Sequence, residues 1–213
     1  ELFLGTLAVN GPMARSVADV AALLSIQAGF DPRDPLSLPA TDLTPDPALD
    51  VSGARIGWLG DYDGYLPFEP GVLELCRSSL AVFSGMGATV EPVDSGFDMD
   101  LLWQSWRTLR HFLVAGSQAA DHADPAKRVL MKPEMLWEIE HGQNLSAAEV
   151  HAASVIRSDW YRHLLGLFDR FDFLILPSAQ VFPFDADLHW PESIAGRRMD
   201  TYHRWMEVVI GPT

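Results

Sequence analysis

The chain has 213 residues, of which 48% are hydrophobic and 21% are charged, and its formal net charge at pH 7 is −14. This length suffices for one sizeable core or for half of a larger domain. Nucleic-acid surfaces need clustered Lys and Arg, so the excess of carboxylates excludes that class of partner. No apolar run approaches the roughly 18 residues that span a bilayer, so no membrane partner is expected.

Cys76 is the single cysteine, which excludes an intrachain disulfide and a cysteine-based zinc site. A lone cysteine fits a reducing compartment, and no secretory signal opens the sequence, so a cytoplasmic protein is expected. The sequence begins at Glu1 and ends at Thr213, and neither end resembles a natural terminus. We therefore expect an interior piece of a longer protein.

The first predicted element is a helix over residues 16–28, because Ser16 and Asp19 have the spacing of a capping box. The apolar residues that share one face of this helix are Val17, Val20, Ala21, Leu24 and Ala28. Gly29 is expected to follow the helix as its C′ residue. The Pro- and Asp-rich stretch 31–50 then predicts a surface connection and a candidate internal boundary.

A strand, a helix and a strand are predicted next, over residues 55–59, 71–84 and 88–93. This succession within ~40 residues is typical of a βαβ unit, whose strands are parallel and whose crossover is right-handed. The apolar face of the intervening helix is formed by Val72, Leu75, Cys76, Leu80 and Phe83.

Three further helices are predicted over residues 98–120, 132–142 and 146–169, and Ser146 and Glu149 form a capping box at the start of the last. The inward-facing residues expected on the first are Leu101, Leu102, Trp106, Leu109, Phe112 and Leu113. Those expected on the last are Val150, Ala153, Trp160, Leu164 and Phe168.

The apolar run 173–177 predicts a strand that is covered on both faces, and residues 202–209 predict a final helix. Helices that alternate with a few buried strands predict an α/β fold, as part of a mixed sheet covered by helices. Three strands are few for this much helix, so the sheet is expected to be incomplete as given.

The loop 177–184 is the best candidate site, because it leaves the carboxyl end of a buried strand, where open α/β sheets bind ligands. Ser178 offers a hydroxyl, Gln180 an amide and Phe182 a ring, a mixture suited to a largely apolar pocket. A plain turn with aromatic packing is the alternative. Trp205 follows closely enough to form a pocket wall, or it serves only packing.

Two segments carry a family resemblance: Gly11-Pro12-Met13-Ala14-Arg15-Ser16-Val17-Ala18-Asp19 and Gly29-Phe30-Asp31-Pro32-Arg33-Asp34. In wording and order they resemble the amidase signature hydrolases, and weaker matches continue in order to Pro212. The resemblance implies that residues 1–213 form the carboxyl-side portion of a single amidase-type domain. It also implies hydrolysis of a small-molecule carboxylic amide to an acid plus ammonia or an amine, through a serine acyl-enzyme and without a cofactor.

The same resemblance implies site residues. In the family, a strand that ends in Leu-Pro-(Ser/Thr) leads into a loop beside the substrate cleft, and Leu176, Pro177 and Ser178 match that pattern. Substrate contacts are therefore expected from Ser178, Gln180 and Phe182, with Trp205 as a wall.

No catalytic residue is expected within this chain. The family nucleophile belongs to a Ser–cis-Ser–Lys triad on a glycine-rich loop, whereas Ser78 and Ser79 lie in an amphipathic helix without a neighbouring glycine. Neither Lys127 nor Lys132 follows a serine by three residues. The chain alone is therefore expected to be inactive and to need an amino-side region for activity.

No metal site is expected either. Asp61-Tyr62-Asp63 resembles the start of a calcium loop, but Leu66 and Val72 stand where the loop needs Gly and Glu. The seven histidines include no His-Glu-x-x-His pattern.

Other functions stay open. Within the family, the alternatives are a glutamine-hydrolysing amidotransferase subunit, which needs a protein partner, and an allophanate-type hydrolase. Outside enzymes, the chain would be a non-catalytic module that binds a small ligand or a partner. A homodimer also stays open.

Overall fold

The computed structural model describes residues 5–7, 10–40, 42–44 and 50–213, and the chain divides into two compact units, Glu1–Asp50 and Val51–Thr213. The first unit contains α1 (Val17–Gln27), as predicted. Ser16 caps α1 by accepting a hydrogen bond from the Asp19 N–H at 3.2 Å. The Asp19 carboxylate accepts a hydrogen bond from the Ser16 hydroxyl, at 2.8 Å, instead of completing the capping box. No residue of α1 is buried.

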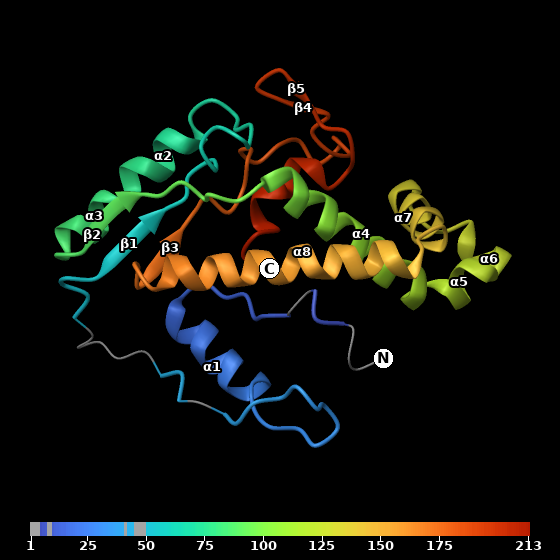
Figure 1. The fold of residues 1–213 in the computed structure, drawn as a ribbon, viewed down its shortest axis with the longest axis horizontal. Coiled ribbons are helices and arrows are strands. Elements are labelled where there is room, and N and C mark those ends of the chain that lie inside the picture. Colours follow the sequence, from blue (N-terminus) through green and yellow to red (C-terminus); the bar gives the residue numbers. More distant parts are fainter. Residues whose placement is uncertain (1–4, 8–9, 41, 45–49) are drawn as a thin grey trace. The chain divides into compact units, whose positions relative to one another are not determined.

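The second unit is built on a three-stranded parallel sheet of β1 (Arg55–Trp58), β2 (Thr89–Pro92) and β3 (Phe173–Ile175). Its strand order is β2-β1-β3, so Ile56 pairs with Val90 on one side and with Phe173 on the other. The predicted parallel strands are thereby confirmed. In Figure 1 the helices between β1 and β2 lie on one side of this sheet and α8 lies on the other.

The helix predicted over 71–84 divides at Leu80 into α2 (Val72–Ser79) and α3 (Ala81–Gly85). The hydroxyls of Ser78 and Ser79 both donate to the Leu75 carbonyl oxygen, at 2.8 and 3.0 Å. Such bonds compete with the backbone ladder and bend helices, which accounts for the division.

Five helices follow: α4 (Met99–Ser117), α5 (Ala119–Ala123), α6 (Pro125–Arg128), α7 (Pro133–Gln143) and α8 (Ala147–Phe168). The capping box of Ser146 and Glu149 is complete at the start of α8, as predicted. The helix α4 packs along both α7 and α8, and its backbone approaches α7 closely at Gly142. Among the described residues, none of the helices is long and apolar enough to cross a membrane.

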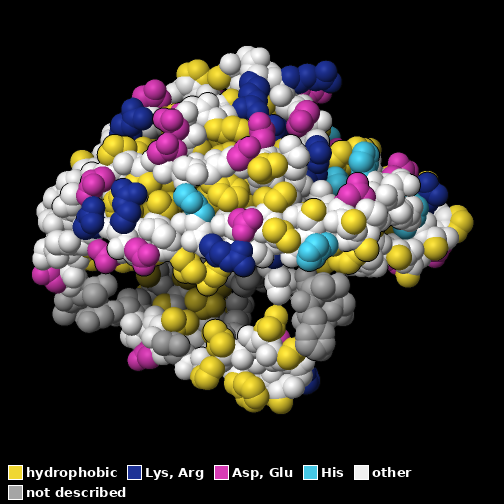
Figure 2. All heavy atoms as spheres, viewed as in Figure 1, with side chains coloured by type: hydrophobic (Ala, Val, Ile, Leu, Met, Phe, Trp, Pro, Cys, Tyr) yellow, Lys and Arg dark blue, Asp and Glu magenta, His cyan; other side chains and the backbone are white. Residues whose placement is uncertain are grey.

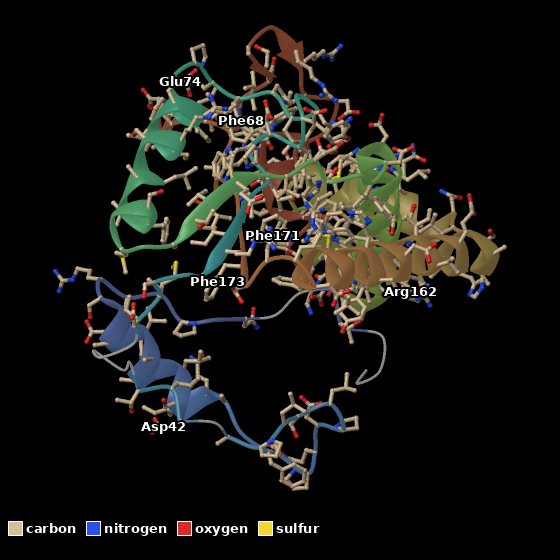
Figure 3. The ribbon with its side chains drawn as sticks, turned by 60° about the vertical axis from the view of Figure 1, so that its left-hand side comes forward. Asp42, Phe68, Glu74, Arg162, Phe171 and Phe173 are labelled. Carbon is tan, nitrogen blue, oxygen red and sulfur yellow. The ribbon has the colours of Figure 1, made fainter. Side chains whose placement is uncertain are left out.

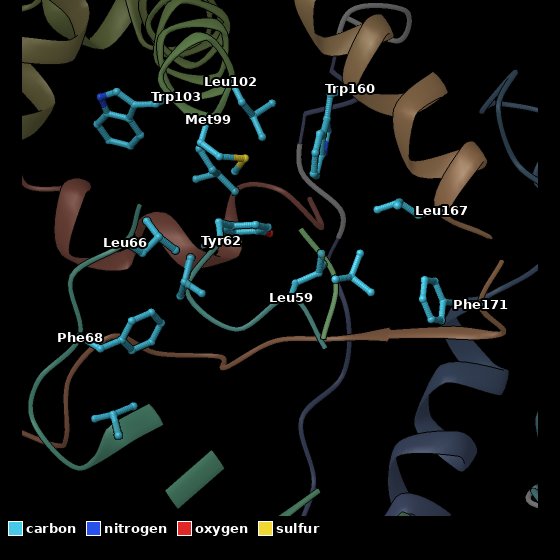
Figure 4. Packing of buried hydrophobic residues seen from close by; sticks show 14 residues of the cluster. Leu59, Tyr62, Leu66, Phe68, Met99, Leu102, Trp103, Trp160, Leu167 and Phe171 are labelled. Carbon is cyan, nitrogen blue, oxygen red and sulfur yellow. The ribbon is translucent and has the colours of Figure 1, made fainter. Parts of the chain in front are cut away.

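The core lies between the sheet, α4 and α8 (Figure 4), where Tyr62 is surrounded by Leu59, Leu66 and Met99. In the side view of Figure 3, Phe68 and Phe171 lie among these crowded side chains, whereas Arg162 on α8 is at the outside. On the face shown in Figure 2, acidic side chains are scattered among basic ones instead of forming one patch.

Several burial predictions are wrong. Leu75 on α2, Leu101 on α4 and Phe168 on α8 are 58%, 42% and 50% exposed. On α4 the buried side is centred on Met99, Leu102 and Trp103, so Leu101 lies at its margin. Phe173 is 52% exposed, so the run is not covered on both faces along its whole length.

The segment after the candidate loop also differs from the prediction. A short hairpin of β4 (Ser193–Ile194) and β5 (Arg197–Arg198) turns through Ala195 and Gly196, both with positive φ. The final helix is the shorter 3₁₀ helix η1 (Arg204–Val209) instead of the whole range 202–209.

Candidate functional site

The loops after β1 and β3 meet at the carboxyl edge of the parallel sheet. The Glu69 N–H donates to the Gln180 carbonyl oxygen at 2.9 Å, and the Phe182 N–H donates to Glu69 Oε2 at 2.8 Å. Because parallel strands end at the same edge, residues more than 100 positions apart are brought together here. This edge carries the predicted loop 177–184.

Gln180 lies at the centre of this arrangement and is fully buried, with 0% exposure. Its Nε2 donates to the Pro67 carbonyl oxygen, and its Oε1 accepts the Val208 N–H, each at 3.0 Å. Both ends of the amide are therefore used inside the protein, and they tie the loop to η1. This geometry fits a positioning residue.

Ser178 and Phe182 lie on the outer side of the same loop, where both are exposed. The Phe182 ring lies over Gly71, whose φ is +98°, so a Cβ there would be strained and 3.5 Å from the ring. Phe182 is thus held against the start of α2 while part of its ring stays accessible.

Trp205 is half-buried in η1 and makes edge-to-face contacts with two rings. The ring centroids of Phe184 and Tyr202 lie 5.4 and 6.5 Å from its own. Its Nε1 is buried without a hydrogen-bond partner among the described residues. Trp205 therefore contacts the candidate loop at Phe184, and its helix, η1, is joined to the same loop by the hydrogen bond of Gln180 with Val208.

A buried ionic cluster joins Glu207 and Arg204 of η1 to Tyr65 in the segment after β1. Glu207 Oε1 accepts hydrogen bonds from the Tyr65 hydroxyl at 2.8 Å and from Arg204 Nη1 at 2.9 Å. Burial raises the pKa of Glu207 to about 7, against the opposing charge of Arg204. Sequence reasoning missed this cluster, although the charged pair at i and i+3 of a predicted helix was its one local signal.

A second buried cluster joins η1 to α4 and α7. His203 Nε2 lies 3.3 Å from Glu138 Oε1, which also accepts from Arg110 Nε at 2.5 Å. His111 is packed edge-on against Trp137, and both of its ring nitrogens are buried without a partner among the described residues. Burial, aided by nearby positive charge, lowers the pKa of His111 and of His203 to about 4.

These shifts predict opposing effects of pH on stability. His111 and His203 bind protons better in the unfolded chain than in the folded one. Each is therefore expected to lower the free energy of unfolding by about 2 kcal/mol at pH 5 relative to pH 8. Glu207 has a raised pKa, so its contribution is full below about pH 4.5 and is lost as pH rises through about 7.

Glu207→Gln removes the group that stabilises the protein at low pH. The decrease in the free energy of unfolding from pH 8 to pH 5 is therefore expected to be larger in the variant by about 2 kcal/mol. Urea titrations of both proteins at pH 5 and pH 8 measure this difference. An unchanged or smaller decrease in the variant would contradict the assignment. Glu192→Gln, at an exposed glutamate, is the control.

A cavity of about 200 Å³ is lined by residues of β3 and α8, and its apolar walls include Leu59, Trp160 and Leu176. Its lining residues do not include Ser178, Gln180, Phe182 or Trp205. Among the described residues, no group of three or more His, Cys, Asp or Glu side chains is arranged to hold a metal ion.

The Amidase family model matches residues 4–210. The chain is 29% identical over 178 residues to an acylamidase of Rhodococcus erythropolis, covering 80% of this chain and 36% of the relative. It is 41% identical over 87 residues to a glutamyl-tRNA(Gln) amidotransferase subunit of Chloroflexus aggregans, covering 39% of this chain and 17% of the relative.

Among solved structures, a bacterial aryl acylamidase of the amidase signature family matches with a TM-score of 0.80 and 27% identity. That match covers 94% of this chain and 44% of the solved one. The chain belongs to the amidase signature family, and its α/β architecture is that of part of the family fold. It spans less than half the length of these relatives.

Proposed function

We propose that this chain is the carboxyl-side region of an enzyme that hydrolyses a carboxylic amide to an acid and ammonia or an amine. The observation that carries this proposal is the family match over residues 4–210. The family resemblance expects a nucleophile from a Ser-Ser loop, and the one adjacent serine pair of this sequence, Ser78 and Ser79, is bonded into the α2 backbone, so the nucleophile is assigned to a region outside residues 1–213. This region supplies scaffold and pocket walls.

Within those walls, Ser178, Phe182 and Trp205 contact the substrate, and Gln180 holds the loop and η1 in place. The accessible part of the Phe182 ring and the rings of Phe184 and Trp205 give this edge an aromatic character. Aromatic walls gain most from an aryl or other apolar group on the amide. The site therefore favours anilide-like substrates.

A glutamine-hydrolysing amidotransferase subunit is the second candidate. The 41% identity over 87 residues to such a protein supports it. Glutamine carries two charges, so its site needs charged partners for both of them. The loop that holds Ser178 and Phe182 instead places rings at the sheet edge, which favours the first candidate.

The experiment compares the full-length protein on acetanilide and on glutamine, with Trp205→Ala as the test variant. We expect turnover of the anilide with a higher kcat/KM than that of glutamine. Loss of the Trp205 wall is expected to lower kcat/KM for the anilide by about tenfold or more. Tyr161→Ala, at an exposed ring on α8, is the matched control.

Unchanged anilide kinetics in the Trp205→Ala protein would contradict the wall assignment. A preference for glutamine would instead support the amidotransferase candidate. Thermal unfolding of each variant separates a local effect on the pocket from a general loss of folded protein.

A further inference from the structure

A cavity of about 240 Å³ lies between the first turn of α7 and the segment that carries β4, β5 and the start of η1. Its walls are formed by three aromatic rings, two carboxylates and one hydroxyl: Trp137, Trp190, Tyr202, Glu134, Asp200 and Thr201. None of its lining residues is Lys, Arg or His. Outside the lining, His189 pairs with Glu134, and Arg204 Nε lies 3.6 Å from Asp200 Oδ1. The lining itself is aromatic and acidic.

The aromatic rings offer electron-rich faces to a cation. Trp190 and Tyr202 meet edge-to-face with centroids 6.4 Å apart, and Trp137 enters from α7. A positive charge over such rings is attracted by their quadrupoles, most strongly where water is partly excluded.

Two polar atoms at the cavity lack a partner among the described residues. Thr201 Oγ1 is buried, in a residue that is 9% exposed, and Glu134 Oε2 is buried while its other oxygen pairs with His189. Buried oxygen atoms are costly without a hydrogen-bond partner, so a group that donates to both atoms is favoured here, as is a positive charge beside the two carboxylates. Both needs are met by one chemical group.

We propose that this cavity binds a small primary alkylammonium ion. The ammonium donates to Glu134 and Thr201, Asp200 adds negative charge at the rim, and the alkyl part lies against Trp137, Trp190 and Tyr202. The proposal is independent of the hydrolytic activity, because binding is measured directly. A free amine and a lysine side chain share this chemistry.

The test is isothermal titration of the full-length protein with isopentylammonium and with isopentyl alcohol, its neutral counterpart. We expect the cation to bind at least about tenfold more tightly than the alcohol. Nα-acetyl-lysine methylamide, titrated in parallel, distinguishes the two sources: tighter binding than that of isopentylammonium assigns the site to a lysine side chain.

Glu134→Gln keeps the size of the side chain and removes its charge, so it is expected to weaken cation binding by about tenfold. Glu140→Gln, at an exposed position on the same helix, is the matched control and is expected to change the Kd by less than about twofold. Trp190→Ala is also expected to weaken cation binding, because it removes one of the aromatic faces. Equal binding of alcohol and cation, or equal binding by the wild type and Glu134→Gln, would overturn the proposal, as would no binding at all.

Discussion

Replacement of Gly142 by alanine is expected to force α7 away from α4 and to destabilise the protein by about 3 kcal/mol or more. A Cβ at this position would lie 2.1 Å from the His111 carbonyl oxygen and 2.5 Å from Ala115 Cβ. The first of these is backbone, so no side-chain rotation relieves the contact. The buried cluster of His111, Glu138 and His203 spans the same interface and would be disturbed with it.

The matched control is Gly166→Ala on α8, where a Cβ would meet nothing within 4 Å. Because alanine favours helix over glycine, this control is expected to stabilise the protein by about 0.5–1 kcal/mol. Urea unfolding of both variants measures the contrast. If Gly142→Ala were no less stable than Gly166→Ala, the close crossing of α4 and α7 would be wrong.

The second large effect is expected at Gln180. Replacement by leucine leaves the Val208 N–H and the Pro67 carbonyl buried without partners, which is expected to cost about 2–4 kcal/mol. It also releases η1, which carries Trp205. Both stability and anilide turnover should therefore fall.

Ser178→Ala is the control on the same loop, because its exposed hydroxyl is expected to contribute less than about 0.5 kcal/mol to stability. The pair separates two roles for Gln180. If Gln180 is a positioning residue, its replacement lowers the free energy of unfolding. If it only contacts the substrate, its replacement raises KM and leaves stability unchanged. The second result would contradict the role of Gln180 in joining the loop to η1.

Local chemistry made much of the fold predictable from the sequence. The capping boxes and cap residues act within a few positions, so the start of α8 at Ser146 and the start of α1 at Ser16 were placed correctly. The parallel pairing of β1 and β2 followed from the short βαβ spacing. These features need no knowledge of distant contacts.

Features that depend on distant contacts were not predictable. The Gln180 amide donates to the carbonyl oxygen of Pro67, 113 residues away, and no sequence pattern predicts such a pair. The exposure of Leu101 and Phe168 depends on the orientation of each helix, which apolar spacing fixes only to within a broad stripe. The hairpin of β4 and β5 has two residues per strand, too few for a pattern.

The position of the candidate loop was predictable, whereas the contacts around it were not. The loop 177–184 does lie at the carboxyl edge of the sheet, and Trp205 does contact it. The supporting pair of Glu207 and Tyr65 joins residues 142 positions apart. Substrate contacts by Ser178, Phe182 and Trp205 stay a prediction, as does the contact expected of Gln180, whose side chain is 0% exposed in this chain.

The most direct test of the account measures aniline release from acetanilide by the full-length protein and by the isolated 213-residue chain. We predict turnover by the full-length protein, abolished by a serine-directed fluorophosphonate, and no turnover by the isolated chain. Turnover by the isolated chain would place the nucleophile within residues 1–213 and contradict the assignment of this region to scaffold and pocket walls.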